Sequence, residues 1–359
     1  MTDKNRYSHC MVLSGGGFRF SYYMGAYAAA VETDNAPDLL LATCGGAIAA
    51  AVIQLLPDDE SRKAWVSSPE MYEFFGNCRA SGASRVRRVI GRAGQRWLQK
   101  EPSPRIPDLF RDYLFDFPRH IPLPPPCAHP TVSVAIIGGK LLYGPDEVNQ
   151  PRSGRKLFIE TVFGDQHTAA LLQGASAPAS SIDNAVSAKL CVESDVSLAD
   201  AVRVSISDMF YLPCFKVGTE HFIGGVIDLV PMELAARLAN RITAENKAPF
   251  NQLFAIPAIR AVLGVDGNSR MREVRGHHAD TWFDTSDVST ALKRHGVKKA
   301  LSWKAPHIRL SMPNTHQDYV KDVQAQWQYG YDRAIAAFSA TKLQAGRNKS
   351  AGQQSVGVQ

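Results

Sequence analysis

The sequence predicts an α/β fold in which helices cover a mainly parallel central sheet. The first observation is that a strand, a tight turn and a helix follow one another twice within the first 60 residues. Parallel strands need crossover connections, which place helices on the faces of the sheet. The second is that further strand-like runs occur at 131–137, 156–162 and 202–206. The third is size, since 359 residues with 45% apolar side chains can form a large core.

The two strand–turn–helix units account for the first part of the sheet. Residues 7–13 are apolar and lead into a row of glycines, which predicts a buried strand that ends in a sharp turn. A helix is expected at about 20–32. The second unit has a short apolar strand at 38–43 and a buried helix at about 45–56. A turn therefore separates strand from helix in each unit.

A strongly basic segment runs from Arg79 to Lys100 and contains seven basic and no acidic residues. Apolar residues recur in it at helical spacing and predict an amphipathic helix. These residues are Val86, Val89, Ile90, Ala93 and Trp97. One interpretation is a surface helix that packs on the core through the apolar stripe. The other is peripheral membrane contact through this segment.

The chain is expected to form a single domain over residues 1–340. The basic segment and a proline-rich stretch form a predicted insertion around 60–130, and residues 117–130 alone contain six prolines. Residues 341–359 are polar and aperiodic, which favours a disordered tail. No internal repeat is present.

Composition excludes several classes of protein. The apolar runs are far shorter than the ~20 residues that span a bilayer. The first ten residues mix charges of both signs, unlike a secretory signal, so a cytoplasmic protein is expected. The six cysteines form no C-x-x-C pair and the histidines do not cluster. Neither a disulfide framework, a metal site nor a bound cofactor is therefore predicted.

A row of three glycines lies between the first predicted strand and helix. Such a turn can direct backbone N–H groups toward one point beside a helix N-terminus, where an anion or oxyanion is stabilised. The residues that can supply these groups are Gly15, Gly16, Gly17, Phe18 and Arg19. A dinucleotide-binding G-x-G-x-x-G motif does not fit, because Phe20 is at its third glycine position. A plain structural turn is the remaining alternative.

Residues 42–46, Ala-Thr-Cys-Gly-Gly, lie between the second predicted strand and helix and have the layout of a G-x-S-x-G nucleophile elbow. Small residues on both sides permit the strained turn that lifts a nucleophile out of the sheet. Cys44 is at the serine position, and the amide of Gly45 is a further candidate oxyanion donor. Taken alone, the motif equally fits an inert core cysteine. Its position one βα unit after the glycine loop favours a nucleophile.

Together these segments resemble the patatin-like phospholipase family, whose members have a G-G-G-x-R/K loop one βα unit before a G-x-S-x-G elbow. A third segment supports the resemblance: residues 201–213 and the pair Gly224-Gly225 are similar to the stretch that ends in the family's D-G-G/A loop. The three segments lie within residues 7–231. The resemblance implies a three-layer α/β/α fold with a mainly parallel sheet. It also implies a serine–aspartate dyad that cleaves acyl esters of lipids.

Two departures from the family pattern concern this dyad. Cys44 replaces the serine, and Ile223 stands where the family has its aspartate. A thiol has an ordinary pKa of about 8.5, which a helix N-terminus lowers, so a cysteine tolerates the loss of the aspartate better than a serine would. Cys44 is accordingly expected to be the most reactive thiol of the chain. Release of an acyl group to water still requires a base.

Two residues are candidates for the missing base. His221 lies two positions before Ile223, on the same side of an extended strand, and a Cys–His pair is sound chemistry. It equally fits an ordinary exposed strand residue. Asp228 is the second candidate, although it would need a displaced loop. Asp208 stands where the family has an apolar residue, so it equally fits a surface substitution.

The leading hypothesis is an acyl hydrolase or acyltransferase that acts on an acyl lipid or acyl thioester through an acyl-Cys44 intermediate. Because the usual base is missing, transfer to an amine, alcohol or thiol competes with release to water. The alternative is an inactive relative that binds acyl chains or lipids, since both dyad residues are replaced. The net charge of +6 suits an anionic partner, but no nucleic acid is expected because no binding motif is present. The sequence does not indicate an oligomeric state.

Overall fold

The computed structural model describes residues 4–99, 101–177, 184–302 and 306–354, with side chains up to residue 343. Its centre is a nine-stranded sheet. The nine strands are β1 (Tyr7–Ser14), β2 (Leu39–Thr43), β5 (Ser133–Leu141), β6 (Phe158–Phe163), β7 (Val186–Glu193), β8 (Phe215–Val217), β9 (Glu220–Ile223), β10 (Ala239–Asn246) and β11 (Thr281–Asp284). Seven of them follow the order β11-β10-β1-β2-β5-β6-β7, and the β8–β9 hairpin pairs with β5.

The sheet is mainly parallel, as the sequence predicts. All neighbours along the seven-strand path are parallel except β5 and β6. β1 and β2 both end at the same edge of the sheet, because Ser14 is in register with Thr43. The turns that follow these two strands therefore meet, and this brings the glycine loop to the elbow.

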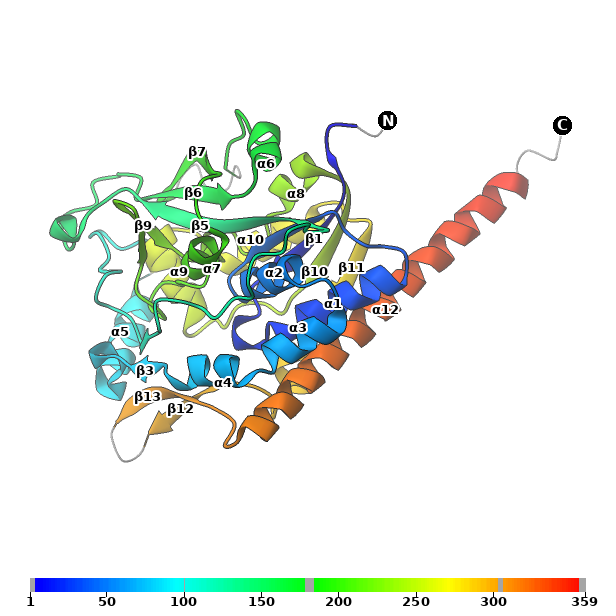
Figure 1. Ribbon diagram of the computed structural model, residues 1–359. Coiled ribbons are helices and arrows are strands. Elements are labelled where there is room, and N and C mark those ends of the chain that lie inside the picture. Colours follow the sequence, from blue (N-terminus) through cyan, green and yellow to red (C-terminus); the bar gives the residue numbers. More distant parts are fainter. Residues whose placement is uncertain (1–3, 100, 178–183, 303–305, 355–359) are drawn as a thin grey trace.

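Helices cover both faces of the sheet (Figure 1). Met11 and Leu13 of β1 point to one face, and Cys10 and Val12 point to the other, because side chains alternate along a strand. The first face packs against α1 (Ser21–Glu32), α2 (Gly45–Leu55), α7 (Leu198–Ser205) and α12 (His316–Gln354). The second packs against α8 (Met232–Leu238) and α10 (Gly267–Gly276). The result is the expected three-layer α/β/α arrangement.

One predicted strand is wrong. The sequence predicts an extended segment at 202–206, but residues 198–205 form α7, whose N-cap Ser197 accepts a hydrogen bond from the Asp200 amide. The short apolar run is ambiguous, because a buried strand and a buried helix look alike over so few residues. The position of α7 beside β5 brings the loop that follows it to the elbow.

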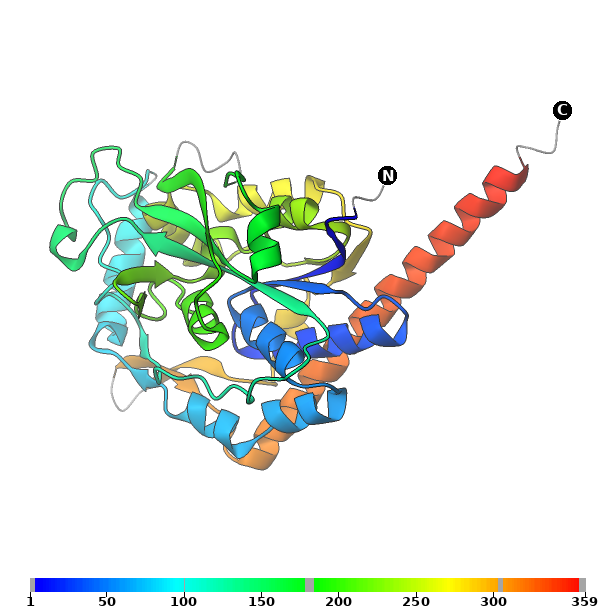
Figure 2. The ribbon, with the colours of Figure 1, turned by 45° about the horizontal axis from the view of Figure 1, so that its top comes forward.

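The region around 60–130 forms a helical flank and an irregular, proline-rich connection. Its helices are α3 (Asp59–Val66), α4 (Pro69–Gly76) and α5 (Val86–Leu98). Two small strands, β3 (Arg79–Ala80) and β4 (Phe115–Asp116), pair with each other. A separate hairpin of β12 (Lys298–Ser302) and β13 (His307–Ser311) lies beside β3 and the start of α5 (Figures 1 and 2). A further helix, α9 (Ala255–Leu263), packs against α5.

Helix α12 packs along α1 and continues past the body of the molecule (Figures 1 and 2). The two backbones touch, since a Cβ at Gly330 would lie 1.8 Å from the Tyr22 carbonyl oxygen. The helix runs to Gln354, whereas the sequence favours an irregular tail after residue 340; residues 355–359 lie outside the described part. Among the described residues, no helix is both long enough and apolar enough to cross a membrane.

Candidate active site

Cys44 lies at a strained turn between β2 and α2. Its φ of 48° is left-handed, a conformation that non-glycine residues rarely adopt and that marks a nucleophile elbow. The turn needs the glycine that follows two residues later, because a Cβ at Gly46 would lie 2.0 Å from the Leu13 carbonyl oxygen. The Cys44 amide donates to Ser205 Oγ at 2.8 Å. The turn between β2 and α2 therefore places Cys44 at the N-terminus of a buried helix.

The glycine loop packs directly on the elbow. Gly15, Gly16 and Gly17 all have positive φ, at 71°, 92° and 55°, so the chain turns as only glycines readily allow. The Gly15 amide donates to the Thr43 carbonyl oxygen at 3.0 Å and ties the loop to β2. A Cβ at Gly45 would lie 2.3 Å from the Gly17 carbonyl oxygen. The two motifs found in the sequence therefore form one site.

Four amides of the glycine loop and the elbow have assigned contacts, and they differ in what they contact. Those of Gly15 and Arg19 are engaged within the protein, the latter with the Gly16 carbonyl oxygen at 3.1 Å. Those of Gly17 and Gly45 approach the Cys44 sulfur closely enough to oppose the rise of its pKa. They are the amides placed to receive negative charge beside the sulfur.

Asp208, in the loop after α7, is the hydrogen-bond partner of the candidate nucleophile. Cys44 Sγ donates to Asp208 Oδ2 at 3.1 Å. The carboxyl lies against the double glycine, since a Cβ at Gly224 would be 2.3 Å from Asp208 Oδ1. A carboxylate thus reaches the elbow from a neighbouring loop, although the family's aspartate position is apolar. Two coincident changes, an acid gained at 208 and an acid lost at 223, are the sequence signal for this arrangement.

The protonation of this pair follows from its burial. Burial raises the pKa of Asp208 to about 6, although its hydrogen bond from Cys44 lowers it. Burial and the neighbouring Asp208 charge raise the pKa of Cys44 well above its ordinary value. Near neutral pH the proton is therefore on the sulfur and the carboxylate is ionised. The lowered thiol pKa expected from the helix N-terminus is not what this environment produces.

His221 and Asp228 lie elsewhere. The ring of His221, on β9, packs edge-on against Phe110 with centroids 5.1 Å apart. Asp228 is buried in a second cavity of about 200 Å³, where it pairs with Arg270 at 3.4 Å. Neither residue lines the cavity at Cys44. The structure therefore brings Asp208, not these two candidates, to the sulfur.

A cavity of about 410 Å³ opens at the elbow. Its wall is almost entirely apolar and aromatic, and Asp208 is the one acidic residue among the described residues that line it. The aromatic residues are Phe18, Phe74, Phe75, Phe115, Phe117, Tyr211 and Phe250. Phe18 of the glycine loop stacks on Phe117, whereas Arg19 does not line the cavity. Such a wall suits a hydrocarbon chain.

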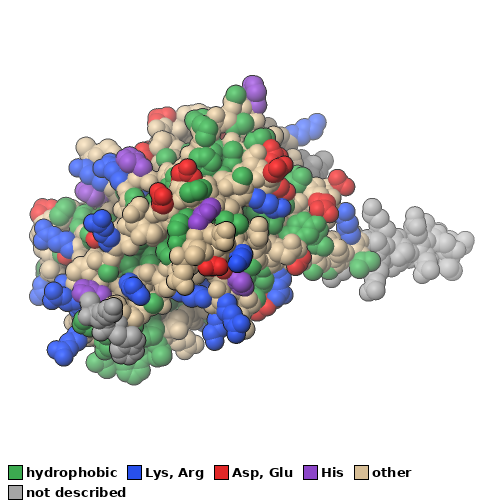
Figure 3. Space-filling view, turned by 60° about the horizontal axis from the view of Figure 1, so that its bottom comes forward, with side chains coloured by type: hydrophobic (Ala, Val, Ile, Leu, Met, Phe, Trp, Pro, Cys, Tyr) green, Lys and Arg blue, Asp and Glu red, His purple; other side chains and the backbone are tan. Residues whose placement is uncertain are grey.

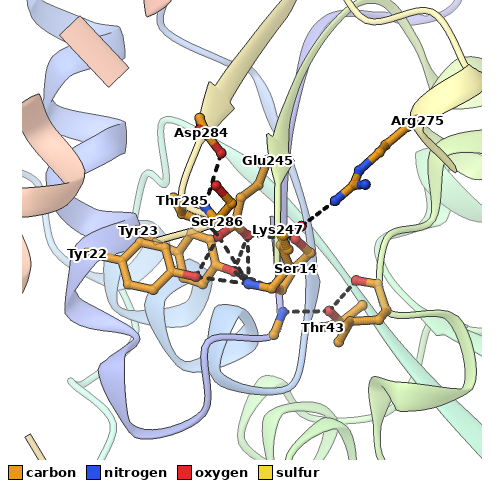
Figure 4. A network of polar contacts seen from close by, with 12 residues as sticks. Ser14, Tyr22, Tyr23, Thr43, Glu245, Lys247, Arg275, Asp284, Thr285 and Ser286 are labelled. Carbon is orange, nitrogen blue, oxygen red and sulfur yellow. Dashed lines mark hydrogen bonds and ion pairs between the residues drawn. The ribbon is translucent and has the colours of Figure 1, made fainter. Parts of the chain in front are cut away.

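A buried carboxylate lies at the centre of a polar network beside the start of the glycine loop (Figure 4). Glu245, at the end of β10, accepts hydrogen bonds from Ser14 Oγ at 2.7 Å and from Tyr23 OH at 2.6 Å. Its charge is compensated by Lys247, whose Nζ lies 3.0 Å from both carboxylate oxygens. The Tyr23 ring also forms the floor of the loop, because a Cβ at Gly16 would lie 2.9 Å from it. Ser14 is thus fixed by this polar network, and the Tyr23 ring packs against Gly16.

The chain matches the patatin-like phospholipase family model over residues 11–236, more than half of its length. The protein belongs to this family. The family suggests a lipid acyl hydrolase, in agreement with a cysteine at an elbow-type turn beside an apolar cavity. A comparison with curated proteins gives no match.

Proposed function

We propose that the protein is a lipid acyl hydrolase or acyltransferase in which Cys44 is the nucleophile and Asp208 is the base. The hydrogen bond between Cys44 Sγ and Asp208 Oδ2, in the wall of an apolar cavity, carries this proposal. The substrate is an acyl ester or thioester whose hydrocarbon chain occupies the cavity. In this proposal the base is Asp208 and not either of the two candidates from the sequence, His221 and Asp228.

The first half of the reaction forms the acyl-enzyme. The sulfur attacks the acyl carbonyl carbon while its proton passes to Asp208 Oδ2, because the thiol itself is not ionised. The amides of Gly17 and Gly45 stabilise the oxyanion. The bond to the leaving alcohol or thiol then breaks, and this group takes the proton from Asp208.

The second half releases the acyl group. Asp208, again ionised, accepts a proton from water or from an alcohol, amine or thiol that attacks the thioester carbonyl. The bond from carbon to sulfur breaks, and the thiol is restored with the proton held by Asp208.

Turnover of a soluble short-chain ester by single variants tests the proposal. Cys44→Ala should abolish turnover, and Cys44→Ser should retain part of it because Asp208 can also accept a serine proton. Cys127→Ala, which changes a thiol that does not line the cavity, is the control. Full activity in Cys44→Ala would contradict the proposal. If the wild-type protein binds fatty acids but turns over no ester, the alternative of an inactive acyl-binding relative replaces the proposal.

We extend the proposal to peripheral membrane contact through residues 79–100. Helix α5 has no buried residue, and Ile90 and Trp97, two turns apart on one face, are 64% and 56% exposed. On the face shown in Figure 3, hydrophobic side chains gather beside Lys and Arg side chains. This combination supports binding at an anionic membrane surface.

Sedimentation with anionic vesicles tests this contact. Less of the Trp97→Ser variant than of the wild-type protein should sediment with the vesicles, and unchanged sedimentation would contradict this contact.

A further inference from the structure

The cavity at Cys44 carries two lysines in a wall whose one acidic residue among those described is Asp208, and the electrostatic settings of the two lysines differ. Lys247 Nζ is 3.0 Å from Glu245, so its charge is neutralised inside the protein. Lys299, on the exposed strand β12, pairs with no carboxylate among the described residues. Its Nζ lies 4.1 Å from the centre of the Tyr211 ring and donates to the Tyr211 hydroxyl. Lys299 is therefore the uncompensated positive charge of the cavity.

The pleat of the β12–β13 hairpin directs Lys299 toward the cavity. Lys299 lies opposite Leu310, which packs against the main apolar core, so this face of the hairpin is turned inward. Lys298 is its neighbour on the same strand and does not line the cavity. Successive strand residues point to opposite faces. The chain thus holds two adjacent lysines, one inward and one outward.

The partner of Lys299 is connected to the base. Tyr211 is 41% exposed and lines the cavity together with Asp208. Its amide donates to the Asp208 carbonyl oxygen at 3.0 Å, so one tight turn carries both residues. An ammonium held on Tyr211 is therefore fixed relative to the nucleophile, at an exposed part of the cavity.

We propose that Lys299 determines specificity for substrates that carry an anionic phosphate group. This phosphate lies outside the acyl chain, on the alcohol or thiol portion of the ester or thioester. This inference rests on the proposed function and names its substrate class. The hydrocarbon chain occupies the apolar wall, and the phosphate binds the exposed ammonium beside Tyr211. A cation that no protein carboxylate neutralises favours an anion there. Both a phospholipid head group and a phosphate-bearing acyl thioester have this chemistry.

Three substrates with one short acyl chain, used below their aggregation concentration, test the inference. They are a monoacylglycerol, the corresponding monoacylglycerol phosphate and the acyl-coenzyme A thioester. In Lys299→Gln, kcat/KM for the phosphate-bearing substrates should fall about 10- to 100-fold, mostly through KM, as expected for a lost charge-assisted hydrogen bond. For the neutral ester it should change less than about twofold. The phosphate-bearing substrate with the larger kcat/KM identifies the natural source.

Lys298→Gln is the matched control, because it removes the same charge from the outward face of the same strand. It should leave all three kcat/KM values unchanged. Equal losses in the two variants, or an equal loss on the neutral ester, would overturn the inference. Binding of decyl phosphate and decanol to Cys44→Ala protein, with and without Lys299→Gln, separates this inference from the catalytic proposal. Decyl phosphate affinity that does not depend on Lys299 would overturn it even if no substrate is turned over.

Discussion

The Asp208 carboxyl carries a cost in stability that follows from its pKa. Its pKa in the folded protein is about 6, above the ordinary value of 3.8, because burial disfavours the charged form. The folded state therefore binds the proton more tightly than the unfolded state, and stability is lost as the pH rises from about 4 to about 6. The shift corresponds to about 3 kcal/mol in the free energy of unfolding above this window.

Asp208→Asn should therefore be more stable than the wild type at pH 8, by up to about 3 kcal/mol, and similar to it at pH 4. The physical reason is that an amide is neutral at both pH values. Urea unfolding at the two pH values measures the difference. The same variant should lose turnover, so a gain in stability accompanies a loss of function. Equal free energies of unfolding of the two proteins at pH 8 would show that the buried Asp208 carboxylate does not destabilise the folded state.

At the scale of elements, strand β9 and the double glycine that follows it explain why position 223, where the family has its aspartate, does not accommodate a carboxylate in this protein. Ile223 is fully buried in an apolar cluster with Leu141, Tyr143 and Phe158. Gly224 and Gly225 have no room for a side chain, because Asp208 and the elbow occupy it. The proposed base, Asp208, instead comes from the loop after α7 and fills the space beside Gly224.

Ile223→Asp should consequently destabilise the protein by at least about 3 kcal/mol, since it buries a carboxylate without a partner. It should not increase turnover. Chemical unfolding and the ester assay measure the two effects, and Ile223→Val, which removes one methyl group, should cost only about 1 kcal/mol. A stable Ile223→Asp protein with faster turnover would mean that the family position remains usable.

Sequence patterns predict the elements that build the site, but they do not predict the side-chain contacts within it. The glycine loop and the elbow were predictable because each combines a strand end, small residues and a helix start. Asp208 is not predicted, because the paired changes at 208 and 223 are its only sequence signal and a lone acid in a loop is usually a solvated side chain. Its position also depends on α7 being a helix. The sequence indicates His221 because it lies two residues before Ile223 on the same side of a strand, and Asp228 because it lies near the end of the segment that resembles the family's loop. Proximity along the chain does not decide which carboxylate a folded loop carries to a sulfur.

At the scale of the whole molecule, the site depends on segments from both ends of the chain. Helix α12 packs on α1, and α1 carries Tyr22 and Tyr23, which bind Glu245 beneath the glycine loop. The close approach of Gly330 to the Tyr22 backbone allows this crossing. Sequence periodicity does not indicate such contacts, because they join residues about 300 positions apart by packing alone. The cavity at Cys44 likewise has lining residues from the first, middle and last parts of the chain.

Acylation of Cys44 is the most direct test of the central claim that Cys44 and Asp208 form the working pair. The protein is mixed with a short-chain acyl thioester, quenched at successive times and analysed by peptide mass spectrometry. One acyl group should accumulate on the peptide that contains Cys44, be absent in Cys44→Ala, and form at least about 100-fold more slowly in Asp208→Asn, since general-base assistance contributes about that much. An acyl group that forms on Cys44 at the same rate without the Asp208 carboxylate, or turnover without any acyl-Cys44, would contradict the account.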